Sequence, residues 1–217
     1  MIMYDLADGI FAVKLARDAA TSFIESEKKL TPPANYPRKF EEKSGVFVTL
    51  KTFKKLGEKI EKTLRGCIGF PYPNAPLIES IIDSAIASAT QDSRFHPPFG
   101  PGPVSSAELS EIVFEVSILT PPQIVEVTNA EEYLGKIQVG RDGLIVERGR
   151  FKGLLLPQVP IEWNWNVREF LENTCNKAYM PIDCWKKPDI KIFTFQAFIF
   201  EEIEPFGEIQ QKEIGDS

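Results

Sequence analysis

Hydrophobic residues in the first half of the chain recur at two different spacings. Across residues 5–27 apolar side chains return every three or four positions, which predicts an amphipathic helix. Residues 45–53 and 62–70 alternate or are rich in β-branched residues, which predicts a hairpin around a charged connection. A second helical stripe begins at Pro76, whose missing N–H is tolerated in a first helical turn. Residues 111–120 then predict another strand.

The second half of the chain repeats this order of elements. Asn129 followed by Glu132 predicts a capping box that opens a short helix. Two strands joined by a tight, basic turn come next, and Asn166 with Glu169 predicts a further capped helix. Residues 189–203 predict one long strand. Helix, hairpin, helix and strand thus occur twice, a pattern consistent with an internal duplication although residue identities do not repeat.

This order of elements favours an α+β fold of two lobes built on mainly antiparallel sheets with flanking helices. We expect the lobes to span roughly residues 1–122 and 123–208, with a groove between them. Residues 209–217 are expected to form a loose tail. Proline-rich composition predicts irregular structure in the segments LTPPANYPRKF and DSRFHPPFGPGP.

Charge and composition narrow the classes of function. The chain has no stretch that approaches the ~20 apolar residues of a membrane helix, and Asp5 and Asp8 stand where a signal peptide carries basic residues. Three cysteines argue against a disulfide framework and for a reducing, cytoplasmic compartment. A net charge of −6 does not support RNA binding. Six basic residues in the segment 51–65 leave either a local basic face or a solvated hairpin as interpretations.

The segment TLRGCIGF, residues 63–70, carries the most distinctive chemistry. Strand alternation would place Arg65 and Cys67 on one face, and a nearby guanidinium lowers the pKa of a thiol. Gly66 and Gly69 remove side chains beside them, as happens where a ligand or another backbone comes close. The alternative is that Cys67 only fills space in the core.

Several other chemistries are excluded or weak. His96 is the only histidine and lies in a proline-bounded loop, so a histidine-rich zinc site is excluded. Cys175 lies on the apolar side of its predicted helix, and Cys184 follows Asp183, which would raise its pKa. The chain has no phosphate-binding Gly-x-x-x-x-Gly-Lys-Ser/Thr loop. We therefore predict no cofactor and no metal.

The stretch LRGCIG resembles the signature of the AMMECR family. Four further segments are similar to the same family: SATQDSRFHPPF, FEVSILT, GLLLPQV and FLENTCNKAYMPIDCW. Tyr179 departs from the pattern, because the family usually has glycine there, and this puts the local turn in doubt. The resemblance covers most of the chain and implies a two-lobed α+β fold with a groove.

The resemblance also implies site residues and partners, although it implies no reaction. The first signature supplies Arg65, Gly66, Cys67 and Gly69. The other segments supply Asp92, Arg94, Glu115, Ser117, Pro157 and Gln158. Partners implied by the family alone are Memo-like proteins and radical SAM proteins.

Two hypotheses of different class follow. In the first, the chain is a cysteine-dependent enzyme with Cys67 as nucleophile or redox centre, Arg65 activating the thiolate, and Glu115 handling protons. In the second, it is a non-catalytic binding or adaptor module for RNA or a protein partner such as a Memo-like protein. Glu115 could instead form an ion pair with Arg65, and Asp92 with Arg94 could simply cap a helix end.

Overall fold

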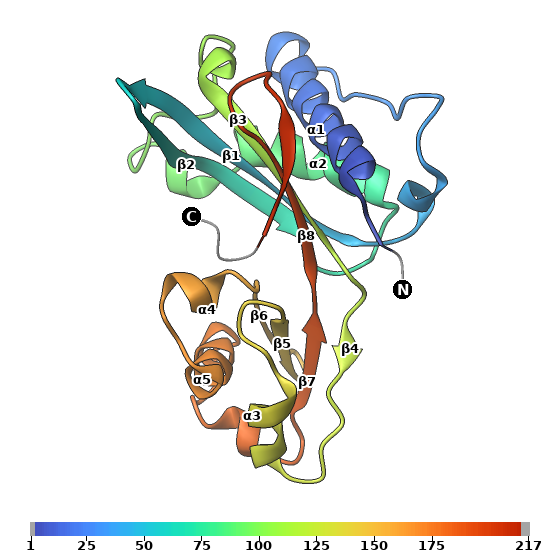
Figure 1. The fold of residues 1–217 in the computed structure, drawn as a ribbon, viewed down its shortest axis with the longest axis vertical. Coiled ribbons are helices and arrows are strands. Elements are labelled where there is room, and N and C mark those ends of the chain that lie inside the picture. The colour runs from blue at the N-terminus through green and yellow to red at the C-terminus, as the bar shows by residue number, and fades with distance from the viewer. Residues whose placement is uncertain (1–2, 214–217) are drawn as a thin grey trace. The chain divides into compact units, whose positions relative to one another are not determined.

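The computed structural model describes residues 3–213, which fold as two compact units (Figure 1). Unit 1 comprises residues 3–118 and 198–212, and unit 2 comprises residues 119–197 with residue 213. The chain therefore passes between the units after Ile118 and again after Ala197. No helix in residues 3–213 has the length and apolar character needed to cross a bilayer.

Unit 1 is built on a five-stranded sheet in the order β2-β1-β3-β8-β9, in which β1 pairs antiparallel with β2 and β8 with β9. Its strands are β1 Gly45–Leu56, β2 Lys59–Phe70, β3 Ile112–Leu119, β8 Ala197–Glu202 and β9 Ile209–Lys212. Its helices are α1 Leu6–Ser26 and α2 Leu77–Thr90, with short 3₁₀ turns at Arg38–Glu41, Ser93–Phe95 and Glu108–Glu111.

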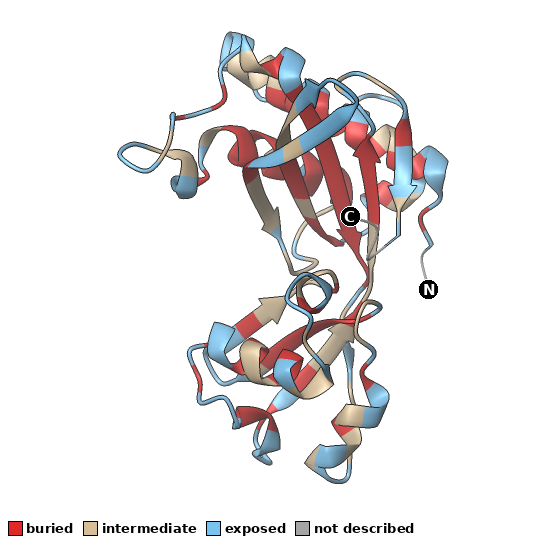
Figure 2. Cartoon of the chain, turned by 60° about the vertical axis from the view of Figure 1, so that its left-hand side comes forward, coloured by how far each residue is buried: buried red, intermediate tan, exposed pale blue. Residues whose placement is uncertain are grey.

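The core of unit 1 lies between the two long helices and one face of the sheet. Helix α1 begins with a capping box formed by Asp5 and Asp8. The apolar stripes of α1 and α2 pack against the inward-facing residues of the strands, coloured as buried in Figure 2. These strand residues include Val46, Val48 and Leu50 of β1 and Ile112, Phe114, Val116 and Ile118 of β3. Alternation leaves the intervening residues on the opposite face of the sheet.

Unit 2 is built on an antiparallel four-stranded sheet in the order β4-β7-β5-β6. Its strands are β4 Gln123–Ile124, β5 Gly143–Arg148, β6 Phe151–Leu155 and β7 Lys191–Phe195. Its helices are α3 Tyr133–Lys136, α4 Val159–Glu162 and α5 Val167–Lys177, with 3₁₀ turns at Ala130–Glu132 and Cys184–Lys186. The predicted capping box of Asn166 and Glu169 opens α5, and the side chain of Asn129 caps the turn before α3.

The predicted α+β class and the repeated order of elements are confirmed. Unit 1 runs α1, β1–β2 hairpin, α2 and β3, and unit 2 runs α3, β5–β6 hairpin, α5 and β7. The strand after the second helix lies beside the first hairpin strand in both sheets, giving β2-β1-β3 and β6-β5-β7.

One predicted strand belongs to two sheets. Residues 189–203 divide at Gln196 into β7 of unit 2 and β8, which joins the sheet of unit 1. Gln196 bonds to Thr120 in both directions, through its N–H to the hydroxyl and through its carbonyl to the N–H, each at 2.8 Å. Residues 198–208 therefore return to unit 1, which differs from the expected boundary. Residues 209–212 of the expected tail form β9, and residues 214–217 lie outside the described residues.

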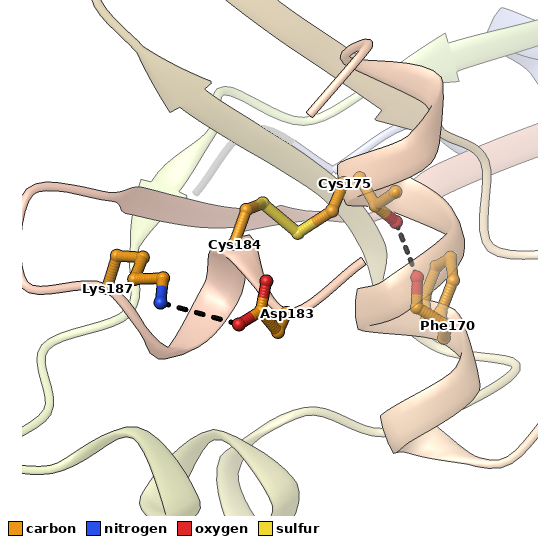
Figure 3. The surroundings of a disulfide bond; sticks show 6 residues. Phe170, Cys175, Asp183, Cys184 and Lys187 are labelled. Atoms are coloured by element: carbon orange, nitrogen blue, oxygen red, sulfur yellow. Dashed lines mark hydrogen bonds and ion pairs between the residues drawn. A yellow bond between two sulfur atoms is a disulfide. The ribbon is translucent and has the colours of Figure 1, made fainter. Parts of the chain in front are cut away.

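Two of the three cysteines form a disulfide, whereas the cysteine count argued against disulfide bonding. Cys175 near the end of α5 is bonded to Cys184, nine residues later (Figure 3). The turn after α5 reverses the chain and brings the two together, a reversal that the odd cysteine count could not indicate. Cys67 is the free cysteine.

Candidate functional site around Cys67

Strand β2 carries one extra residue at the centre of the LRGCIG motif. Leu50 of β1 pairs with Gly66, but the next residue, Lys51, pairs with Leu64, so Arg65 is left out of the register. Because cross-strand partners share a face, this bulge puts Leu64 on the same face of the sheet as Cys67. The simple alternation expected from the sequence is therefore interrupted between Arg65 and Cys67.

Arg65 has partners of its own, away from the thiol. It is buried, its Nε donates to Glu108 at 2.8 Å, and one terminal nitrogen donates to the carbonyl of Gly102 at 3.0 Å. Its guanidinium also lies 5.6 Å from the ring centre of Phe95. The arginine thus ties β2 to the segment that follows α2.

The two motif glycines allow a close approach of neighbouring groups. A Cβ atom on Gly66 would lie 2.1 Å from the backbone carbonyl of Ser88 in α2. A Cβ on Gly69 would lie 2.3 Å from the carbonyl of Val46 and 2.5 Å from the ring of Phe47. The glycines are therefore explained by packing of β2 against α2 and β1.

Asp92 and Arg94, just after α2, hold the backbone of Cys67. Asp92 accepts the N–H of Cys67 at 2.9 Å, and Arg94 donates to the carbonyl of Cys67 at 3.2 Å. The two side chains also form an ion pair at 2.6 Å. Hydrogen bonds from Arg94 lower the pKa of Asp92, so this carboxylate stays ionised at neutral pH. Asp92 additionally caps the 3₁₀ turn Ser93–Phe95.

The Cys67 thiol is half-buried and accepts a hydrogen bond from the Thr49 hydroxyl at 3.3 Å. Burial raises its pKa above that of a free thiol. Thr49 and Arg94 act in the opposite direction, but Glu115 and Asp92 raise the pKa further. His96, the histidine that could have served as a base, has its Nε2 2.9 Å from the carbonyl of Thr90. Cys67 is therefore a neutral thiol at pH 7.

Glu115 takes part in a chain of ion pairs on the sheet face that carries Cys67. Its carboxylate lies 2.6 Å from Lys51, which is also 3.6 Å from Glu201, and Glu201 is 3.5 Å from Lys62. Burial lowers the pKa of Lys51, but Glu115 and Glu201 outweigh it and raise the value overall. Burial raises the pKa of Glu201, but Lys51 and Lys62 outweigh it and lower the value overall.

Thr49, Lys51 and Glu201 are not among the residues that the sequence indicates for this site. Thr49 and Lys51 alternate with the buried apolar residues of β1, and this alternation could have placed them on the sheet face of Cys67. The position of Glu201 depends on strand β8, which returns to the sheet from far along the chain. Ser117, two residues after Glu115, is buried on β3.

Pro157 and Gln158 belong to unit 2, where they precede the short helix α4. The carbonyl of Gln158 accepts the N–H of Glu162 at 3.0 Å, while its side-chain Oε1 is buried and has no hydrogen-bond partner among the described residues. Within residues 3–213 no group of three or more histidine, cysteine, aspartate and glutamate residues is arranged to hold a metal ion.

Comparisons with known proteins agree on one family. The AMMECR1 family model matches residues 13–200. Protein MJ0810 of Methanocaldococcus jannaschii is 46% identical over 214 residues, which cover 99% of this chain and 100% of the relative. Protein TK0174 of Thermococcus kodakarensis is 47% identical over 97% of this chain and 98% of its own length. The crystal structure of the uncharacterized protein PH0010 from Pyrococcus horikoshii matches with a TM-score of 0.82 and 48% identity, covering 94% of this chain and 96% of that one.

Proposed function

The chain belongs to the AMMECR1 family, and we propose that it is a non-catalytic module that docks a protein partner through one face of the β1–β2 hairpin. We call this face the hairpin face and define it by Phe53, Lys55, Ile60 and Leu64. The observation that carries the proposal is the exposure of two large aliphatic side chains on it. Ile60 is 50% exposed and Leu64 is 44% exposed.

The register of the hairpin mixes apolar and basic side chains on this face. Lys55 is opposite Ile60, Phe53 is opposite Lys62, and Lys51 is opposite Leu64. Residues paired in this way share a face, so an aliphatic or aromatic group lies beside each lysine. Exposed aliphatic groups on a solvent-facing strand add little to stability, and their clustering is typical of protein interaction surfaces.

The contacts around Cys67 support binding rather than catalysis. Arg65 is held by Glu108 and Gly102, so its charge is already compensated. Burial raises the pKa of the Cys67 thiol, and a neutral thiol is a weak nucleophile. Since the bulge brings Leu64 onto the face of Cys67, the thiol can act as a small apolar contact that continues the hairpin face.

The charges favour a protein partner over RNA. Lys51 and Lys62 are paired with Glu115 and Glu201, which leaves them little net charge for phosphate. Lys55 has no carboxylate within ion-pair distance among the described residues, and it would suit an acidic group on a partner. A net charge of −6 also opposes non-specific RNA binding. The Memo-like protein that the family resemblance suggests is the first candidate.

Calorimetric titration with a purified Memo-like protein from the same organism tests this proposal. We expect Ile60→Thr and Leu64→Thr, which place a residue of high strand propensity at each position, to weaken binding by about tenfold or more. Ile182→Thr is the matched control, because Ile182 is 61% exposed and lies in unit 2. Cys67→Ser, which changes one small contact beside the hairpin face, should weaken binding less than either threonine variant.

Two results would contradict the proposal. One is loss of binding in Cys67→Ser with no effect of Ile60→Thr, which would indicate that binding depends on the sulfur atom and not on the hairpin face. The other is no binding of the Memo-like protein together with binding of a single-stranded RNA that Ile60→Thr and Leu64→Thr weaken. Thermal unfolding of each variant checks that the fold is retained.

A further inference from the structure

Unit 2 contains a pocket whose lining includes none of the residues of the hairpin face. Its volume is about 620 Å³, within the range of small-molecule sites. One wall is the turn between β5 and β6, and the other is the loop that follows α5. The lining residues are Arg148, Gly149, Arg150, Phe151, Tyr179, Met180, Pro181 and Asp189.

Tyr179 occupies a backbone position that suits glycine. It follows the C-cap of α5 with a φ of +57°, in the left-handed region. The turn is closed by hydrogen bonds from Tyr179 N–H to the carbonyl of Asn176 and from Met180 N–H to the carbonyl of Cys175, at 2.9 and 3.0 Å. The side chain of Tyr179 is nevertheless 92% exposed. Neither backbone preference nor burial accounts for an aromatic ring here, whereas contact with a ligand does.

The loop that carries Tyr179 is fixed at both ends. The Cys175–Cys184 disulfide closes the loop, as Figure 3 shows, and both cysteines are buried. On the opposite wall, a Cβ on Gly153 would lie 2.6 Å from the N–H nitrogen of Ala178, so β6 runs directly against the end of α5. This approach holds Phe151, two residues earlier in β6, at the same pocket as Tyr179. The backbone segments that carry the two rings are therefore anchored on either side of the pocket.

The pocket also presents two arginine side chains, Arg148 and Arg150. Arg148 is paired with Asp189 at 2.7 Å. Among the described residues no carboxylate lies within ion-pair distance of Arg150, whose guanidinium lies 5.3 Å from the ring centre of Phe151. A ligand that matches this set has a planar ring to lie against tyrosine or phenylalanine and an anionic group to bind arginine.

We propose that this pocket binds a nucleoside phosphate, with the base against the Tyr179 ring and the phosphate on Arg150. The same chemistry occurs in a free mononucleotide and in a nucleotide of single-stranded RNA. This proposal is independent of the hairpin face and stands on different residues.

Titration of the intact, oxidised protein with AMP, adenosine, inorganic phosphate and a short oligoadenylate, followed by tyrosine fluorescence and calorimetry, tests the proposal. We expect Tyr179→Gly to weaken AMP binding about tenfold or more while the protein stays folded, because glycine suits the turn. Arg150→Gln should weaken AMP but leave adenosine unchanged. Phe99→Ala, which removes an 83% exposed ring from unit 1, is the matched control.

The outcomes distinguish a free mononucleotide from a nucleotide of single-stranded RNA. Binding of AMP that both pocket variants weaken supports a free nucleotide. Binding of the oligonucleotide alone, weakened by the same variants, supports an RNA segment as the source of the same chemistry. Absence of binding by any probe at millimolar concentration, or binding that Tyr179→Gly and Arg150→Gln leave unchanged, overturns the proposal.

Discussion

Gly66→Ala is the sharpest perturbation of the LRGCIG motif, because it adds a single methyl group at the contact between β2 and α2. That methyl would lie 2.1 Å from the carbonyl oxygen of Ser88 and 3.1 Å from the carbonyl carbon. Gly66 is in an ordinary strand conformation, so alanine introduces no backbone strain of its own. The obstacle is helical backbone, which no rotation of a side chain can relieve. The strand and α2 must separate by about 1 Å.

Overpacking of this kind costs roughly 3 kcal/mol. Alanine also restricts the unfolded chain, which offsets about 0.4–1 kcal/mol of the cost. The net loss of about 2 kcal/mol predicts a Tm lower by roughly 4–8 °C for a chain of this length, measured by differential scanning calorimetry.

Gly135→Ala is the matched control for this change. No atom of residues 3–213 outside the local backbone would lie within 4 Å of a Cβ at Gly135, which belongs to helix α3. The control should raise the free energy of unfolding by a few tenths to about 1 kcal/mol. A Tm of Gly66→Ala equal to or above that of the wild type would refute the packing explanation of the motif.

Arg65, Tyr179, Asp92 and the disulfide each affect stability in a way that can be measured. Arg65→Met should cost about 2 kcal/mol in unfolding free energy through loss of the Glu108 and Gly102 bonds, without changing the alkylation rate of Cys67. Tyr179→Gly should raise the Tm, since relief of about 1–2 kcal/mol of left-handed strain exceeds the 0.5–1 kcal/mol entropy cost of glycine; an unchanged or lower Tm would contradict this. The pKa of Asp92 is lower in the folded protein than the unfolded value of about 3.9. Its contribution to stability is therefore present above the unfolded pKa and is lost as the pH falls through the folded pKa. Asp92→Asn should remove this contribution and flatten the acid limb of a curve of Tm against pH. Reduction of the disulfide should destabilise unit 2 by about 2–3 kcal/mol, measured by hydrogen exchange of α5.

Most of the order of helices and strands could be predicted from the sequence, because helix caps and alternating strands are local features. The Asn166–Glu169 capping box and the span of α1 needed only residues within one or two turns. The division of residues 189–203 between two sheets could not be predicted, since both halves have the same β-rich composition and their separation depends on Thr120, far away in the chain. The disulfide likewise depends on a chain reversal after α5.

The pairings of the candidate residues could not be predicted from the sequence. Asp92 and Arg94 bond to the backbone of Cys67, and Glu115 lies on the same face of the sheet as Cys67. One extra residue in β2, however, directs Arg65 to Glu108, and a bulge leaves no mark in hydrophobic periodicity. The prediction that Arg65 lowers the pKa of the Cys67 thiol therefore depends on a regular strand alternation that the bulge interrupts.

Iodoacetamide alkylation of Cys67 across pH 5–10, resolved by peptide mass spectrometry in the folded and the unfolded chain, tests the central claim most directly. A neutral, half-buried thiol predicts slower reaction in the folded protein and a midpoint above the ~8.5 of a free thiol, unchanged in Arg65→Met. A midpoint well below that value in the folded protein, rising when Arg65 is replaced, would contradict the binding-module account and identify Cys67 as an activated nucleophile.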